Sequence, residues 1–297
     1  PMKSNSFLYW EQELGRYRKE ERTLSRIKWW KNRPWDQVKK LPRDNEKVEN
    51  LEQDAVTIAH TFSTEETRRL LKEVPANYSI STKELLTACL TIVLREWDQK
   101  THAIYLESFG RDMLTEQMNN ARTIGWFTQV YPFLMEINEE DSLNNILRKC
   151  KDALAEVEKY KAEYLMYSDS ESGAGYERER ESLLFNYLGQ LDNTVEESSD
   201  YSIISGNELF PRGGYNHRPF LMDVTAYISK EQLHIEICYS NRIYKESTMR
   251  RLLTNYVSKI SDSVAHCIET EESSLTASDF SDVDLEDLDY ILSKFGD

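Results

Sequence analysis

The sequence predicts a fold of helices and strands, either α+β or α/β, in which a mixed β-sheet is flanked by helices. Strand-like and helix-like segments alternate without the regular strand–helix–strand spacing of a parallel sheet. A hydrophobic fraction of 39% and a charged fraction of 30% are typical of a globular chain with a buried core. Glycine-rich phosphate loops of the GxGxxG or GxxxxGK type do not occur in the 297 residues.

The N-terminal third predicts a helix, a connector and a strand. Apolar residues recur at helical spacing over 6–31 and predict one helix there. Pro34 and Pro42 interrupt the following charged connector. Residues 55–62, AVTIAHTF, alternate between apolar and polar positions, which indicates a strand.

Two helices are predicted from a repeated Ser-x-x-Glu pattern. In this capping box the serine hydroxyl accepts from a backbone N–H of the first turn, and the glutamate accepts from the serine N–H. The predicted helices cover about 64–73 and 83–97. The two boxes are Ser63 with Glu66 and Ser81 with Glu84.

Three further strands are predicted in the middle of the chain. Residues 102–109 read as a strand that ends at Gly110. Residues 130–137 predict a second strand, and Pro132 indicates either an edge strand or the start of a strand, because proline cannot donate to a neighbouring strand. The run LLFNYLGQ at 183–190 is the third.

The remaining elements are two helices and a hairpin. Asp141 or Ser142 is positioned to cap a helix over about 143–160. Residues 218–240 predict a hairpin that turns at SKEQ. A long amphipathic helix follows, with Ser247 expected as its cap.

Charge and composition argue against several classes of partner. The net charge is −15 and no cluster of Lys and Arg occurs, so we expect neither nucleic-acid binding nor attraction to anionic membranes. No stretch approaches 18 consecutive apolar residues. The four cysteines have no CxxC spacing, which predicts buried reduced thiols and a cytoplasmic location. The five histidines are scattered, so no metal site is expected.

Glu107 and the Asn186-Tyr187 pair are the strongest catalytic candidates. Glu107 stands at the end of a strand before a glycine, and an apolar setting would raise its pKa and suit it to general acid–base work. The alternative is an exposed Glu paired with Arg111. Adjacent strand residues point to opposite faces, so one member of the Asn186-Tyr187 pair can face a site. The alternative for Tyr187 is a buried hydroxyl bonded to the backbone.

Two other segments have a composition typical of residues that line a substrate channel. The segment RTIGWFTQVYPF brings together Arg122, Trp126, Phe127 and Thr128, and core packing is its alternative. A glycine-containing loop at 172–182 is expected either to act as a lid or channel wall or to be an ordinary solvent loop. Its candidate residues are Gly173, Gly175 and Tyr176.

Taken together, these motifs resemble those of epimerization domains of nonribosomal peptide synthetases, which belong to the condensation-domain superfamily. The similar segments are STKELLTACLTIVLREW, LESFGRD, RTIGWFTQVYPFLMEI, the Gly-Tyr loop, FNYLGQLD and LTASDFSDVDLEDLDYIL, together with SFLYWEQEL near the N-terminus. Their order and spacing match across essentially the whole chain. The pairing of Gly-Trp-Phe-Thr with Phe-Asn-Tyr-Leu-Gly is absent from ordinary condensation domains.

The resemblance implies a fold, a domain layout and a reaction. The fold is a lobe similar to chloramphenicol acetyltransferase, with 55–297 as the C-terminal lobe and 1–54 as a linking helix and connector from an N-terminal lobe. The reaction converts an L- to a D-aminoacyl or peptidyl thioester on a peptidyl carrier protein by removal and return of the Cα proton. Phosphopantetheine on the carrier is the substrate tether, no cofactor is bound directly, and other synthetase modules are the expected partners.

The resemblance also assigns roles to residues. Glu107 would exchange the Cα proton, and Tyr187 and Asn186 would orient the enolate or relay protons. Arg111, Arg122, Trp126, Phe127, Thr128, Gly173, Gly175 and Tyr176 would line the substrate tunnel, with Trp126 and Phe127 packed in its wall across from Glu107.

The sequence departs from the family pattern in two ways. The His-His-x-x-x-Asp-Gly motif is absent, and by alignment it would precede residue 1, so we expect this chain alone to be inactive as an epimerase. The family's Glu-Gly-His-Gly-Arg-Glu reads Glu-Ser-Phe-Gly-Arg-Asp at 107–112. Two alternatives therefore stay open, a non-catalytic scaffold or carrier-protein docking module and an amide-forming condensation domain.

Overall fold

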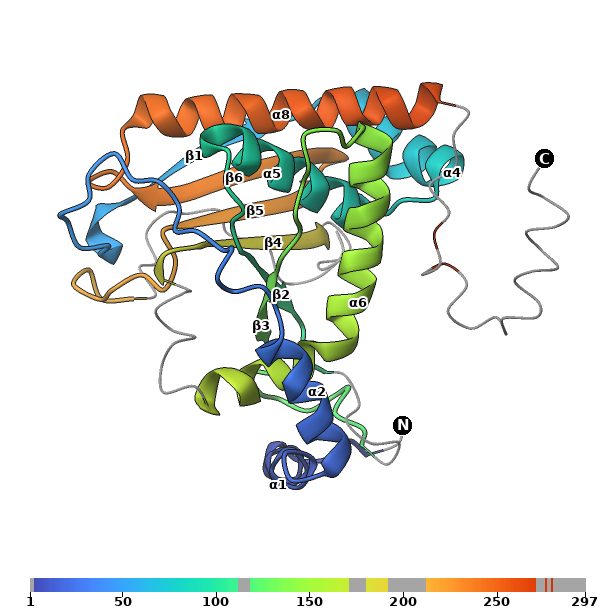
Figure 1. Cartoon of the computed structure of the whole chain (residues 1–297), viewed down its shortest axis with the longest axis vertical. Helices are drawn as coiled ribbons and strands as arrows, with labels where there is room; N and C mark the ends of the chain where they lie inside the picture. The colour runs from blue at the N-terminus through green and yellow to red at the C-terminus, as the bar shows by residue number, and fades with distance from the viewer. Residues whose placement is uncertain are drawn as a thin grey trace, which may run out of the picture.

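The computed structural model describes residues 3–111, 118–170, 180–191 and 212–270, together with Thr276 and Asp279. A six-stranded mixed sheet with helices packed against it forms the fold, as the sequence predicts (Figure 1). The strands run in the order β1-β6-β5-β4-β2-β3. Their bounds are β1 Ala55–Thr61, β2 Ile104–Ser108, β3 Gln129–Phe133, β4 Leu183–Gln190, β5 Met222–Ser229 and β6 Gln232–Ser240.

Strand pairing follows the sequence signals closely. β4 is parallel to both of its neighbours, β2 and β5, and the other pairs are antiparallel. β3 is an edge strand and contains Pro132, as expected. The β5–β6 hairpin turns through Lys230 and Glu231, whose φ angles of 50° and 61° match the twist of a tight two-residue turn.

The helices supply the other layer. They are α1 Phe7–Tyr17, α2 Glu21–Lys31, α3 Thr64–Arg68, α4 Val74–Tyr78, α5 Thr82–Asp98, α6 Leu143–Ser170 and α8 Glu246–Glu269, with short turns η1 Glu52–Asp54 and η2 Arg69–Glu73. α5 and α8 pack on each other and on one face of the sheet, where their apolar side chains join those of the strands in one core (Figure 1). α5 is nearly all buried, and Tyr256 of α8 donates its hydroxyl to the Leu86 carbonyl.

The sheet therefore has one apolar face and one polar face. In β5 the buried residues are Met222, Val224, Ala226 and Ile228, and the residues between them are half-buried. β6 alternates in the same way. We call the second side the polar face. Its side chains include Glu107, Asn186, Asp223, Thr225, Tyr227, His234 and Glu236, placed by strand register and alternation.

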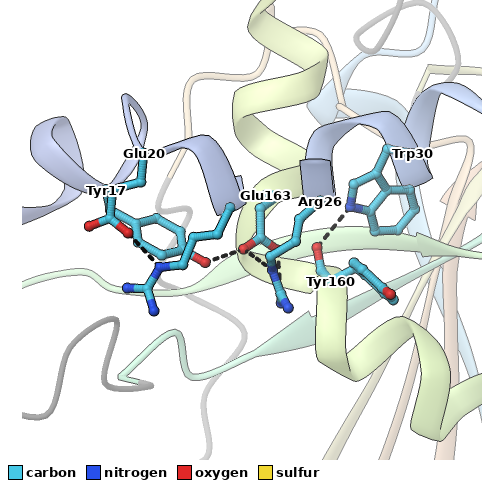
Figure 2. A network of polar contacts seen from close by, with 7 residues as sticks. Tyr17, Glu20, Arg26, Trp30, Tyr160 and Glu163 are labelled. Carbon is cyan, nitrogen blue, oxygen red and sulfur yellow. Dashed lines mark hydrogen bonds and ion pairs between the residues drawn. The ribbon is translucent and has the colours of Figure 1, made fainter. Parts of the chain in front are cut away.

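The predicted helix over 6–31 is broken into α1 and α2, and a buried carboxylate explains the break. Glu163 of α6 is 0% exposed and accepts hydrogen bonds from the Tyr17 hydroxyl of α1 and from Arg26 of α2, whose Nε lies 2.7 Å away (Figure 2). Trp30 of α2 donates to the Tyr160 carbonyl at 2.7 Å. Both helices must reach α6, so the chain turns at 18–20 between them.

Three other expectations about helices need correction. α8 begins at Glu246 after Lys245, which makes no side-chain cap, so Ser247 is the second residue of the helix. α6 extends to residue 170, beyond the expected end at 160, and Ser142 caps it by accepting from the Asn145 N–H at 3.2 Å. The helix predicted over 64–73 is α3 followed by the π-helical turn η2.

Three of the four cysteines are buried, as the sequence predicts. Cys89, Cys150 and Cys267 are buried, Cys238 is half-buried and all four are free thiols. Burial raises the pKa of Cys89 to about 12, which keeps it a neutral thiol. Within the described ranges, no helix is long and apolar enough to cross a membrane, and no group of three or more metal-binding side chains gathers.

Replacing Ser81 tests the cap of α5. Both halves of the predicted capping box form, because the Glu84 N–H donates to the Ser81 hydroxyl at 3.3 Å and the Ser81 N–H donates to the Glu84 carboxylate at 2.7 Å. We expect Ser81→Ala to lower the free energy of unfolding by about 1 kcal/mol. Urea titration measures this loss, and Ser81→Thr, which retains the hydroxyl, should lose much less. Equal losses would contradict the cap.

Glu158 of α6 should control part of the acid stability. It accepts from Lys83 Nζ at 2.8 Å, Lys161 Nζ at 2.8 Å and the Tyr131 hydroxyl at 2.6 Å. Burial alone raises the pKa of this carboxyl, but the two lysines and Tyr131 lower it to about 2. An unfolded Glu has a pKa of about 4.3. Because the folded pKa is the lower one, the stabilisation is complete above the unfolded pKa and is lost as the pH falls through the folded one.

We expect Glu158→Gln to flatten the dependence of unfolding free energy on pH between about 4.3 and 2, because the variant has no proton to gain there. Urea titrations at a series of pH values measure the slope. Glu139→Gln is the matched control, since Glu139 is exposed on the loop before α6. A slope in Glu158→Gln as steep as in the control would contradict the assignment.

Candidate functional site

Glu107 lies at the carboxyl end of β2, half-buried on the polar face. The parallel register that pairs Leu106 with Phe185 brings Asn186 of β4 beside it. Asn186 donates its side-chain N–H to Glu107 Oε2. The predicted catalytic residues Glu107 and Asn186 are therefore in direct contact, although 78 residues separate them in the chain.

Two charged residues that the sequence analysis missed lie close to this pair. Asp223 is on β5, one strand beyond Asn186, and faces the same side of the sheet. Arg218 precedes β5 and donates from Nη2 to Asp223 Oδ2 at 2.6 Å. A single carboxylate inside the apolar run FLMDVTAY was the available signal, because a charge is rarely placed in a strand without a partner.

The electrostatics of the site shift the pKa of Glu107 upward. Burial raises the pKa of Glu107, and the nearby Asp223 charge raises it further. The hydrogen bond from Asn186 and the charge of Arg212 act in the opposite direction without cancelling the rise. Burial also raises the pKa of Asp223, against the lowering effect of Arg218. A carboxyl with a raised pKa exchanges protons closer to neutral pH.

Tyr187 lies on the opposite face of β4 from Asn186, as the alternation of adjacent strand residues predicts, and a catalytic role for it stays a prediction. Consecutive strand residues point to opposite faces, so Tyr187 faces the apolar side and packs against the core. Its hydroxyl interacts with Thr82 at the start of α5. Burial raises the pKa of Tyr187 and keeps the phenol neutral.

The turn after β2 is fastened to the segment before β3. Gly110 has a φ of +61°, and a Cβ there would come 1.6 Å from the Phe127 carbonyl oxygen. Arg111 donates from Nη1 to the carbonyls of Asn120 at 2.7 Å and Thr123 at 2.9 Å, and its guanidinium lies 4.3 Å from the centre of the Phe127 ring. Arg111 thus holds the segment of 120–127 in place, with its donors directed to backbone carbonyls.

The aromatic segment divides into a buried and an exposed residue. Phe127 is 4% exposed and contacts the rings of Phe7 and Trp10 of α1, with centroids 5.2 and 5.1 Å away. Trp126 is 81% exposed and Arg122 is also exposed. Phe127 is thus a packing residue, whereas Trp126 presents its ring to solvent, and a role for either in a substrate tunnel stays a prediction.

A groove of about 580 Å³ runs between α1, the start of β3 and α6. Trp126, Phe127 and Thr128 line it together with Val130, which pairs with Glu107 across β2 and β3. Glu107 itself is not among the lining residues. Of the expected tunnel residues, Trp126, Phe127 and Thr128 border the groove, and Arg111 and Arg122 are not among its lining residues. Gly173, Gly175 and Tyr176 lie outside the described residues.

Comparison with known proteins decides the family. The model of the condensation domain family matches residues 1–286. The chain belongs to the condensation domain family. Gramicidin S synthase 1 of Brevibacillus brevis is 31% identical over 327 residues and covers 100% of this chain. Tyrocidine synthase 1 of Brevibacillus parabrevis is 30% identical and covers 95% of it. This chain spans only 28% and 27% of the length of these two relatives.

Solved structures agree with this assignment of the fold. The epimerization domain from the third module of tyrocidine synthetase B matches with a TM-score of 0.76 at 24% identity, covering 91% of this chain and 61% of that one. A four-domain nonribosomal peptide synthetase bound to AMP and glycine matches with a TM-score of 0.64 at 15% identity, covering 86% and 20%. The sheet and helices described above are therefore those of a condensation domain.

Gly110 and Gly189 form a matched pair that tests how the condensation domain fixes Glu107. Both have positive φ, +61° and +70°, but a Cβ at Gly189 meets nothing within 4 Å. We expect Gly189→Ala to cost only the backbone strain of about 1–2 kcal/mol. Gly110→Ala adds the clash with the Phe127 carbonyl and should destabilise clearly more. Urea unfolding measures both losses, and equal losses would show that this close approach does not constrain the turn.

Proposed function

We propose that this chain is the glutamate-bearing lobe of an epimerization domain, which converts an L- to a D-aminoacyl or peptidyl thioester on a carrier protein. The contact between Glu107 and Asn186 on the polar face is the observation that carries the proposal. It places a half-buried carboxyl with a raised pKa, hydrogen-bonded by an amide, at the end of a sheet strand. The similarity in fold to an epimerization domain of tyrocidine synthetase B supports it.

The chemistry needs a group of this kind. In the proposed reaction the Glu107 carboxylate takes the Cα proton, and the electron pair of the C–H bond forms an enolate whose charge lies on the thioester oxygen. Return of a proton to the opposite side of Cα gives the D-configuration, and protonation on the same side restores the L-configuration. Asn186 fixes the direction of the Glu107 carboxyl by donating to one of its two oxygens.

The layout of the longer protein is part of the proposal. Residues 55–297 form the C-terminal lobe, and 1–54 are a linking helix and connector from an N-terminal lobe. A peptidyl carrier domain presents the substrate on its phosphopantetheine arm, and other synthetase modules are the remaining partners. The lengths of the relatives support this layout, since this chain spans less than a third of gramicidin S synthase 1 and of tyrocidine synthase 1.

Glu107→Gln in the full-length gene product tests the proposal. We expect it to abolish exchange of the substrate Cα proton with solvent, because the amide cannot accept that proton. Mass spectrometry of the loaded carrier protein in deuterated water measures the exchange. Glu236→Gln is the matched control, since Glu236 lies on the same polar face three strands away from β2 and should leave the exchange unchanged.

Exchange at the wild-type rate in Glu107→Gln would remove Glu107 from the mechanism. Absence of exchange in the wild-type gene product would favour a docking module instead, and amide formation between two loaded carriers would favour a condensing enzyme. Residues 1–297 alone should give no L-to-D conversion, because a substrate would lack the proton donor on its second side.

A further inference from the structure

We propose that Asp223 and Arg218 form a fixed charge pair that controls the protonation of Glu107. Asp223 is the positioning residue, because it places a negative charge on the same face as Glu107, with β4 between their strands, and acts through Glu107. Arg218 anchors that charge. The inference deepens the proposed function and depends on it for its catalytic consequence only, since the protonation of Glu107 is measurable in the chain itself.

Strand register places the two carboxylates on the same face. Asn186 pairs with Thr225 and Leu184 pairs with Asp223, so Asp223 shares the polar face with Asn186. Glu107 lies on the other side of Asn186, in contact with it. β4 alone separates the strands that carry the two carboxylates. The sheet, a rigid element, thus fixes how far apart Glu107 and Asp223 lie.

Arg218 prevents Asp223 from moving away. The Arg218 side chain is 2% exposed, and its Nη2 donates to Asp223 Oδ2 at 2.6 Å and to the Cys238 carbonyl at 3.1 Å. Its Nη1 is buried without a hydrogen-bond partner in the described part of the chain. A guanidinium in this position cannot lose its carboxylate partner without leaving a charge buried and unpaired, which is strongly unfavourable. Asp223 is therefore held in place against Arg218.

A buried ion pair of this kind contributes little net stability. Desolvation of two charges offsets most of their attraction, and well-packed apolar residues often replace such a pair without loss. One nitrogen of Arg218 is also left without a partner, which adds a cost. Stability therefore gives a poor explanation for this pair, whereas an electrostatic effect on the neighbouring Glu107 explains both the charge and its rigid support.

The other groups around Glu107 do not cancel the effect of the Asp223 charge on its pKa. Asn186 faces it from β4, Val130 pairs with it from β3, and Arg212 approaches from the segment before β5. Arg212 and Asp223 are both paired, with Glu52 at 2.9 Å and with Arg218 at 2.6 Å, but Arg212 is 58% exposed, so solvent screens its charge more strongly. The Asp223 side chain is 33% exposed and is less screened. Repulsion by Asp223 therefore adds to burial in raising the pKa of Glu107.

Removal of the Asp223 charge should lower the pH at which Glu107 titrates, because a carboxylate forms more easily without a neighbouring anion. The measurement is a pH titration of residues 1–297 labelled with 13C at the glutamate carboxyl carbon and followed by NMR. Glu107→Gln identifies the Glu107 signal by its loss. We expect the Glu107 midpoint to move to lower pH in Asp223→Asn and to stay in place in Glu236→Gln, the control carboxylate on the same face.

Two further measurements keep the inference testable if Asp223→Asn does not fold. Asp223→Thr introduces a neutral side chain suited to a strand and should cause the same downward shift. In the wild-type chain, the Glu107 titration curve should also show a second inflection where Asp223 titrates, because coupled carboxyls report on each other. An unchanged or raised Glu107 midpoint in the folded variants, or a wild-type curve without the second inflection, would overturn the charge pair.

The activity assay separates this inference from the proposed function. In the full-length gene product, Asp223→Asn should move the acidic limb of the pH profile for Cα proton exchange to lower pH. A shift in the NMR titration without any wild-type exchange would leave the charge pair standing and overturn the epimerase. Exchange by the wild type without an NMR shift in Asp223→Asn would support the epimerase and overturn the charge pair.

Discussion

The two-sided character of the six-stranded sheet is the constraint on which the rest of the structure depends. α5 and α8 fill one face with apolar side chains, so every second residue of β4, β5 and β6 must face the other side. Groups from strands that are distant in sequence are collected there, and Glu107, Asn186 and Asp223 become neighbours. A slip of one residue in any of these strands would move its polar side chains into the core and its apolar side chains out of it. The stability of the core and the geometry of the candidate site therefore depend on the same register.

A second set of contacts fixes the edge of the sheet formed by β2 and β3, and it connects this edge to the N-terminal helices α1 and α2. Gly110 allows the chain after β2 to pass against the Phe127 carbonyl, and Arg111 binds the backbone of the following segment. Phe127 then packs on Phe7 and Trp10 of α1. The α1 and α2 helices are held on α6 by the buried Glu163 (Figure 2). Most of these contacts are polar and directional, so they define an orientation for the β2 end and not only its burial.

Local patterns in the sequence predicted what depends on local physics. The capping boxes, the edge position of Pro132, the hairpin turn and Glu107 at a strand end each follow from a few neighbouring residues. The break in the helix over 6–31 could not be predicted, because it depends on Glu163, which lies far along the chain. Arg218 and Asp223 were missed for the same reason, since their significance arises from a strand order that places β5 beside β4. Strand alternation predicted that Asn186 and Tyr187 face opposite sides of the sheet, but which of them lies beside Glu107 depends on the register of β4 against β2.

Inversion at a carbon centre places a requirement on this geometry that a single sheet cannot meet. Glu107, Asn186 and Asp223 all project from one face, so in the proposed reaction they approach a substrate from one side. A proton returned from that side restores the original configuration, and the second proton donor must therefore stand across from the polar face. A base held on a rigid sheet can remove the proton from one side only, so the return from the other side falls to a different group. The neutral amide of Asn186 and the anchored charge of Asp223 then have distinct effects on Glu107. Asn186 sets the direction of the carboxyl, and Asp223 adjusts how readily the carboxyl holds its proton.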